Sequence, residues 1–223
     1  MDHSENQVRA GEVGATTPVD YVVYQKILIE NIISKLGVST RGHRYILVHF
    51  SDGNSYQVPG EDHYTNKTGI LFDTTESYVQ SVMFDKIKSF PELDAGGATD
   101  LKLVMDVISN SVVPQIANTT DPLRLTYMVI FTTGFYDTET NCCQDPLESA
   151  LRVQSYFKPD TIIPVMSGKL ADRNATMLLE YTGYNSQLPM YDVKQNSTAD
   201  SIVQTIQDAI SAQKAKNDAE QTI

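Results

Sequence analysis

Polar residues that could bind a ligand follow two segments of the chain. Residues 127–131 (Tyr-Met-Val-Ile-Phe) are apolar and lead directly into Thr132, Thr133 and Gly134. A short glycine-containing segment, residues 95–100, ends in Thr99 and Asp100. Hydroxyl and carboxylate oxygens can bind a hard cation such as Mg²⁺, and they can also hydrogen-bond to a protein partner. The two segments are therefore candidate binding loops. Thr133, at the end of the first segment, carries no charge.

A catalytic motif is missing from the sequence. It contains no Gly-x-Ser-x-Gly nucleophile, and residues 96–97 lack both a Walker lysine and the Gly-x-Gly-x-x-Gly spacing. His49 falls inside an apolar run, where a core histidine is the simpler reading, and solvated loop charges explain Asp137 and Glu139. The alternative to a binding module is thus an α/β hydrolase-like or nucleotide-linked enzyme with an unidentified site. A deep apolar cavity with convergent polar groups would favour the enzyme, and a shallow rim of loops would favour the binding module.

Alternating strand and helix patterns predict how these loops are positioned. Apolar runs predict strands at 45–50, 125–132 and 161–166, a further short strand is expected near 190–193, and the turn at 51–54 predicts an antiparallel edge strand at 55–58. Helical spacing predicts helices at 18–36, 77–90, 101–113, 146–157, 171–181 and 199–212. This order predicts an α/β fold with a three-layer, doubly wound (Rossmann-like), mostly parallel sheet, one antiparallel edge strand and helices on both faces. Ligands bind at the carboxyl ends of the strands in such sheets, where both loops would lie.

One domain accounts for most of the 223 residues. We expect residues 1–17 to form a polar N-terminal arm or a remnant of a first strand and loop, residues 18–213 the domain, and residues 214–223 a charged tail. The net charge of −11 argues against nucleic acid or an anionic membrane surface as the partner. No apolar run reaches the roughly 18 residues of a membrane span.

Glycosylation sequons favour a secreted glycoprotein, with chance matches as the alternative. The polar residues 1–7 lack the apolar core of a signal peptide. The adjacent Cys142 and Cys143 could bond to each other only under strain, so free thiols or pairing with another chain are the alternatives. The four sequons begin at Asn66, Asn118, Asn174 and Asn196.

The order of these motifs resembles a von Willebrand factor type A (VWFA) domain over about residues 18–213. The resemblance implies a non-enzymatic, adhesion-type module that binds a protein or an extracellular-matrix ligand through loops at the carboxyl ends of the strands. It rests on a helix leading into residues 44–51 (Arg-Tyr-Ile-Leu-Val-His-Phe-Ser), the turn at 52–53, residues 96–101 (Gly-Gly-Ala-Thr-Asp-Leu), 129–134 (Val-Ile-Phe-Thr-Thr-Gly) and 178–183 (Leu-Leu-Glu-Tyr-Thr-Gly).

Such domains typically bind Mg²⁺ through three loops at a metal-ion-dependent adhesion site (MIDAS). The loops carry Asp-x-Ser-x-Ser after the first strand, a Thr after the glycine loop, and an Asp at the fourth strand end. Thr99 matches the second loop, although Thr99 or Asp100 could equally cap the next helix. Thr133 stands where the third-loop Asp would be. The resemblance therefore makes Thr99 the candidate metal ligand, and Gly97, Thr99, Asp100, Thr133, Tyr136 and Asp137 the candidate partner-binding residues.

The first loop has two candidate positions. The family spacing to Val22 would place it at residues 12–16 (Glu-Val-Gly-Ala-Thr), whereas residues 2–6 (Asp-His-Ser-Glu-Asn) have the ligand types but require an insertion before the helix. An apolar strand precedes neither, so either residues 7–10 supply a poor short strand or the chain is truncated. Since two of the three loops depart from the pattern, we expect a degenerate MIDAS without tight Mg²⁺ binding and no other cofactor.

Overall fold

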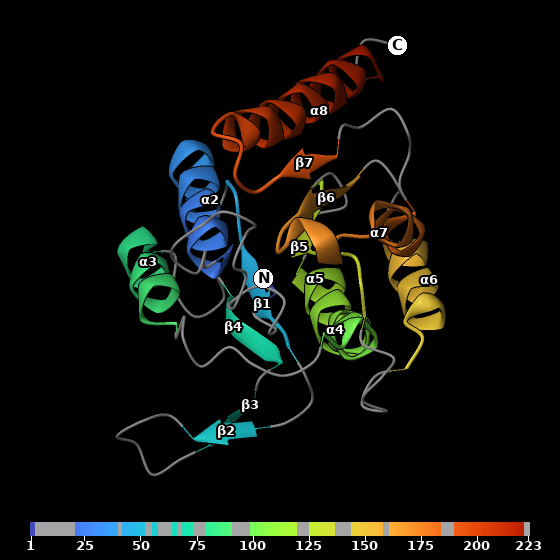
Figure 1. The fold of residues 1–223 in the computed structure, drawn as a ribbon. Helices are drawn as coiled ribbons and strands as arrows, with labels where there is room; N and C mark the ends of the chain where they lie inside the picture. The colour runs from blue at the N-terminus through green and yellow to red at the C-terminus, as the bar shows by residue number, and fades with distance from the viewer. Residues whose placement is uncertain are drawn as a thin grey trace.

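Three parallel strands form the sheet that carries the Thr132–Gly134 loop. The computed structural model describes residues 1–2, 21–39, 42–51, 55–57, 64–66, 68–73, 79–90, 99–119, 125–136, 144–157, 161–183 and 190–220 (Figure 1). Strands β5 (Met128–Thr132), β6 (Ile162–Met166) and β7 (Tyr191–Asp192) pair in parallel in that order. Every residue of β6 is buried, which matches its unbroken apolar sequence.

An antiparallel pair lies beside these strands, but its partner strand differs from the prediction. Strand β1 (Ile46–His49) pairs with β4 (Gly69–Asp73), whereas β2 (Ser55–Gln57) pairs with β3 (Tyr64–Asn66). The strand expected at 55–58 is therefore present as β2, but it pairs with β3 and not with β1. Residues 70–72 (Ile-Leu-Phe) supply the apolar surface that a strand packed on the core needs, and residues 55–57 (Ser-Tyr-Gln) do not.

Helices pack on two sides of the strands, around two hydrophobic clusters. Successive residues of β5 point to opposite faces: Phe131 belongs to the first cluster and Ile130 to the second. The fold is thus α/β with a three-stranded parallel sheet, and the complete doubly wound order stays a prediction. Helices α2 (Tyr21–Leu36), α3 (Gln80–Ser89) and α8 (Thr198–Glu220) contribute to the first cluster; α4 (Leu101–Val107), the π-helix Ile108–Val112, α5 (Val113–Thr119), α6 (Leu147–Tyr156) and α7 (Ala175–Thr182) surround the second.

Two helices run further than the sequence suggested. The helix expected to close before Pro114 continues through the π-helix into α5. Pro114 is the second residue of α5, and the wider π turn lets the helix restart where a missing N–H is tolerated. Helix α8 extends to Glu220, beyond the expected end at residue 212. No helix in the described part of the chain is long and apolar enough to cross a membrane.

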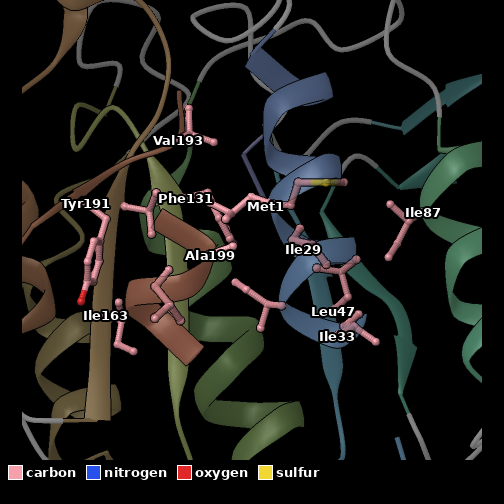
Figure 2. Close-up of a cluster of buried hydrophobic side chains, with 14 of the residues drawn as sticks. Met1, Ile29, Ile33, Leu47, Ile87, Phe131, Ile163, Tyr191, Val193 and Ala199 are labelled. Atoms are coloured by element: carbon pink, nitrogen blue, oxygen red, sulfur yellow. The ribbon is translucent and has the colours of Figure 1, made fainter. Parts of the chain in front are cut away.

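The first two residues lie in the interior. Met1 is 5% exposed and Asp2 is 0% exposed. The backbone N–H of Phe50 donates to the carbonyl of Met1 (3.0 Å), and Asp2 forms a parallel bridge with Phe50. The N-terminus lies between β1 and β5 (Figure 1), and Figure 2 shows Met1 between Phe131 of β5 and Ile29 of α2 in the first cluster. Residues 3–17 of the expected arm lie outside the described residues.

Candidate functional site

Buried polar residues meet at the carboxyl ends of the strands. The hydroxyl of Thr132 donates to Oδ2 of Asp2 (2.9 Å). Nε2 of Gln25, on α2, donates both to the carbonyl of Asp2 (2.8 Å) and to Oγ of Ser167 (2.9 Å). The N–H of Ser167 in turn donates to the carbonyl of Thr132 (3.0 Å). These four residues, all 0% exposed, form a network that ties β5, β6, α2 and the first residues of the chain together.

Thr133 is held by its own loop. Its Oγ1 accepts from the N–H of Phe135 (3.3 Å), and its carbonyl accepts from the N–H of Asn174 (2.7 Å). The side chain is buried. Gly134 follows with φ +78, and a Cβ there would clash with the carbonyl oxygen of Asn174. In this structure, then, Thr133 helps to hold the turn that follows β5 against the start of α7.

Asp100 caps α4, as one of the two alternatives for the glycine loop predicted. Its Oδ1 accepts from the N–H of Leu103 (2.9 Å), and its own N–H donates to the carbonyl of Ser51 (2.9 Å). Burial raises the pKa of its carboxyl, against the lowering effect of the Leu103 N–H. Thr99 beside it is 1% exposed. The loop is therefore anchored to the end of β1, at the same edge as Asp2.

The structure bears on where the first-loop motif lies. Asp2 stands at the strand ends, where the motif at residues 2–6 would place its carboxylate. The other candidate, residues 12–16, and the remainder of the 2–6 motif lie outside the described residues. So do Gly97 and Asp137 of the expected partner-binding loops.

The described oxygen donors fit Mg²⁺ poorly. Mg²⁺ requires near-octahedral geometry and usually keeps several waters. Asp2, Thr99 and Thr133 are almost fully buried, and hydrogen bonds already engage Asp2 and Thr133. Within the described ranges, no three Asp, Glu, His or Cys side chains gather to hold a metal ion.

An exposed rim surrounds this buried network. Phe135 (38% exposed) follows β5, and Leu170 (70% exposed) lies in the 3-10 helix Leu170–Asp172 after β6. Tyr136 is half-buried and packs edge-on against Tyr181, with ring centroids 6.2 Å apart. Burial, together with the Tyr136 hydroxyl and nearby acids, raises the pKa of Tyr181. Of the predicted partner-binding residues that the structure describes, Tyr136 is the one placed on this rim.

Two cationic side chains, Arg173 (10% exposed) and Lys194, lie at this edge beside the buried Tyr21, and no sequence pattern indicated them. Arg173 forms an ion pair with Asp192 at the end of β7, and its guanidinium lies 5.7 Å from the centroid of the Tyr21 ring. The ammonium of Lys194 lies 4.7 Å from the same centroid. Tyr24, whose ring centroid is 5.8 Å from that ammonium, is 38% exposed.

The sequence gives only a partial indication of the buried network. Gln25 interrupts the apolar face of α2, and Ser167 directly follows a buried strand. Neither feature by itself indicates that the two side chains meet.

A cavity of about 260 Å³ lies between β1 and β5 rather than at the loop rim. Its middle is apolar, with Ile46, Val48, Met128 and Ile130 on its walls. Its described lining contains no Ser or Cys nucleophile. His49, the histidine inside the predicted strand, is buried and packs on Phe90, with centroids 5.0 Å apart.

Comparison with known proteins shows the class of fold. No protein-family model matches the sequence, and no curated protein matches it. The structure is similar to manganese-loaded TRAP protein from Plasmodium vivax, with a TM-score of 0.59 and 14% identity over 92% of this chain and 70% of that one. It is also similar to proximal thread matrix protein 1 from the mussel byssus, in crystal form 2 (TM-score 0.60, 12% identity) and with a zinc-occupied MIDAS motif (TM-score 0.60, 15% identity).

The chain covers 44% and 45% of the two mussel structures, less than half of each, while 91% of this chain is matched. These neighbours contain VWFA domains. The protein therefore has a VWFA-like fold, as its motif order predicted.

Proposed function

We propose that this protein is a non-enzymatic, adhesion-type module that binds a protein or matrix ligand through the rim at the carboxyl ends of its strands. The observation that carries the proposal is that buried polar residues and exposed apolar residues are separated at this edge. The polar residues of the strand ends are buried and hydrogen-bonded to one another, whereas Phe135 and Leu170 project from the loops after β5 and β6. Exposed aromatic and aliphatic side chains around a rigid centre are suited to protein contacts.

The rim offers both apolar and cationic contacts. Lys194 places a positive charge beside the exposed ring of Tyr24 on a chain whose net charge is −11, whereas Arg173 is 10% exposed and already paired with Asp192. A partner surface that combines apolar groups with carboxylates would match this part of the rim. The VWFA-like fold supports a role in protein binding.

Binding without a tightly held Mg²⁺ is part of the same proposal. Thr133 brings no negative charge, and Asp100 serves as a helix cap. Asp2 is the acid left at the MIDAS-like position among the described residues, and it already accepts from Thr132. Calorimetric titration with Mg²⁺ and Mn²⁺ tests this point. Low-micromolar binding that Thr99→Ala or Asp2→Asn abolishes would contradict it.

A solid-phase adhesion assay tests the proposed surface. The purified 223-residue protein is applied to immobilised collagen, fibronectin and laminin, each with and without EDTA. Phe135→Ser combined with Leu170→Ser should weaken any saturable binding by about fivefold or more. Leu151→Ser is the matched control, because Leu151 is 54% exposed but lies on α6, away from the rim. Two results would count against the rim as the binding surface. One is an equal loss of binding with Leu151→Ser. The other is binding that EDTA abolishes but the two rim substitutions leave unchanged.

We also propose an extracellular location. The mussel protein is described as a matrix protein of the byssus. Asn196, one of the four sequons, is exposed before α8, whereas Asn174 uses its side chain to cap α7 by accepting from the N–H of Met177 (3.0 Å). Mass spectrometry of the natural protein should therefore find an N-glycan at Asn196. An unmodified Asn196 in protein recovered from its source would contradict the proposal.

A further inference from the structure

Leu170 and Lys194 lie on neighbouring loops of the rim. Leu170 begins the 3-10 helix that follows β6, and Lys194 follows β7. Strands β6 and β7 pair in parallel, so the two loops leave the same edge of the sheet (Figure 1). Paired strands lie about 4.8 Å apart, which brings the two loops side by side.

A largely buried ion pair fixes one loop against the other. Arg173, directly after the 3-10 helix, pairs with Asp192, the last residue of β7. Nε of Arg173 also donates to the carbonyl of Gly168 (2.9 Å), and its side chain is 10% exposed. The relative position of Leu170 and Lys194 is therefore set by contacts beneath the surface.

Lys194 is oriented by Asp192 and by two tyrosine rings. Oδ1 of Asp192 accepts from the backbone N–H of Lys194 (2.8 Å), so the carboxylate that pairs with Arg173 also shapes the turn after β7. The ammonium lies 4.7 Å from the ring centroid of Tyr21 and 5.8 Å from that of Tyr24. Cation–π contacts restrict a long side chain, so less rotamer entropy is lost when this ammonium binds a partner.

Exposed apolar surface accompanies the ammonium. Leu170 is 70% exposed and Tyr24 is 38% exposed, whereas Tyr21 is fully buried. An ammonium has three N–H donors, so that of Lys194 can donate to a carboxylate while it stays beside the rings. An apolar side chain next to that carboxylate would cover Leu170.

The charge at this position suits a single carboxylate better than a polyanion. Polyanions such as sulfated glycosaminoglycans bind clustered cations. Arg173, the other cation described at this edge, is already paired with Asp192, and the net charge of −11 repels a highly charged anion. We propose that Lys194 and Leu170 form a subsite for an acidic residue flanked by an apolar residue in a protein partner, an inference that rests on the binding function proposed for the rim.

An NMR titration of the full 223-residue protein with two capped peptides tests the subsite. One peptide is Gly-Leu-Asp-Leu-Gly, and the other is Gly-Leu-Asn-Leu-Gly, which lacks the charge. We expect the Asp peptide to shift the backbone signals of Leu170 and Lys194 and to bind about threefold more tightly than the Asn peptide. Added salt should reduce this preference, because the contact lies at the surface.

Substitutions assign the preference to its residues. Lys194→Met keeps the apolar stem without the charge and should abolish the preference for Asp, whereas Lys194→Arg should retain it. Leu170→Ser should weaken both peptides equally. Lys35→Met is the matched control and should leave the preference unchanged: Lys35 is 46% exposed and lies in the last turn of α2, whereas Tyr21, beside Lys194, begins that helix.

Three kinds of result would overturn the proposal. Equal affinities for the two peptides, or no shift with either, would show that the subsite does not select a carboxylate beside an apolar residue. Equal effects of Lys194→Met and Lys35→Met would assign the preference to the overall charge of the protein. Binding of a heparin oligosaccharide that is tighter than that of the Asp peptide and is lost with Lys194→Met would assign Lys194 to a polyanion.

The matrix-adhesion assay separates this subsite from the rim as a whole. Phe135→Ser combined with Leu170→Ser tests the rim, and Lys194→Met in the same assay tests the subsite. We expect both to weaken binding. Matrix binding that the double substitution weakens but Lys194→Met leaves unchanged would keep the proposed function and reject the role of Lys194.

Discussion

The hydroxyl of Thr132 donates a hydrogen bond to the buried carboxylate of Asp2 over 2.9 Å, which joins the end of β5 to the first residues of the chain. Thr132→Val keeps the shape of the side chain but leaves a buried carboxylate oxygen without this donor. We expect it to lower the free energy of unfolding by about 1–3 kcal/mol. Urea denaturation measures the change.

Thr176→Val is the control for this substitution, since Thr176 is exposed on α7. It should change the stability by less than about 0.5 kcal/mol. In a protein that already carries Asp2→Asn, the cost of Thr132→Val should be smaller, because an amide oxygen is a weaker acceptor than a carboxylate. Additive effects of the two substitutions would show that the bond contributes nothing to stability.

The buried amino group of Met1 predicts a pH dependence of stability. Its pKa falls from 8.0 in the unfolded chain to about 5 in the folded protein, because burial disfavours the charged form. Between these values the unfolded chain binds more protons than the folded one, so stability rises with pH from 5 to 8. The full effect is about 4 kcal/mol, and it is lost as pH falls through 5.

Acetylation of the amino group isolates this contribution. The acetylated protein has no titrating group at this position, so the difference in unfolding free energy between the two forms should shrink steadily from pH 5 to pH 8. All other ionisable groups are common to both forms and cancel. A difference that does not vary with pH would mean that the amine is accessible to water in the folded protein.

Local sequence patterns predicted individual strands and helix ends, because these depend mainly on neighbouring residues. The strand at 161–166, for example, is a continuous apolar run, and β6 occupies residues 162–166 with every residue buried. The first helix was expected to end at residue 36, and it does: Gly37 follows with φ +75 and an N–H that donates to the carbonyl of Ile33 (2.8 Å). The helix cap at Asp100 was one of two stated alternatives.

Pairing between strands or side chains that are distant in the sequence could not be predicted from local patterns. Residues 55–57 follow a turn signal directly, yet β1 pairs with β4, which lies further along the chain. Nothing local marks Asp2 as a core residue, since its burial depends on Gln25 and Thr132 from distant elements. The same holds for Arg173, whose partner Asp192 is 19 residues away. Side-chain networks between elements carry no periodic signal in the sequence.

Gly134 and Gly37 form a natural comparison of backbone strain and steric clash. Both have positive φ, +78 and +75. A Cβ at Gly134 would meet the carbonyl oxygen of Asn174 and lie 2.8 Å from Cβ of Leu178, whereas a Cβ at Gly37 would meet nothing within 4 Å. Gly37→Ala should therefore cost about 1 kcal/mol for its φ alone. Gly134→Ala should cost about 3 kcal/mol or more, because α7 must shift as well.

Thermal and urea unfolding of the two alanine variants provide the measurement. The Gly134 variant should also disturb the rim, since the loop carries Phe135. Nearly equal destabilisation by the two substitutions would show that the loop after β5 can move away from α7 without penalty, and would weaken the description of this edge as a rigid centre.

Asp106 links α4 to α6 through three side-chain donors. It accepts from Lys102 (2.8 Å) on its own helix, and from Ser149 and Arg152 (2.7 Å each) on α6. Burial alone would raise the pKa of its carboxyl, but the three hydrogen bonds outweigh that effect and lower it. A lowered pKa means that the carboxylate stabilises the folded protein at neutral pH, and that this contribution is lost as pH falls through the folded-state value.

Asp106→Asn should therefore lower the free energy of unfolding at pH 7 by about 1–2 kcal/mol, since the two helices lose a charged acceptor shared by three donors. Glu148→Gln is the matched control: Glu148 also pairs with Arg152 (3.0 Å), but its side chain is 86% exposed. Its effect should stay below about 0.5 kcal/mol. Urea denaturation at pH 7 and at pH 3 checks both expectations, because the difference between wild type and the Asp106 variant should be smaller at pH 3. A difference that persists undiminished in acid would show that packing between α4 and α6, rather than the charge of Asp106, holds the two helices together.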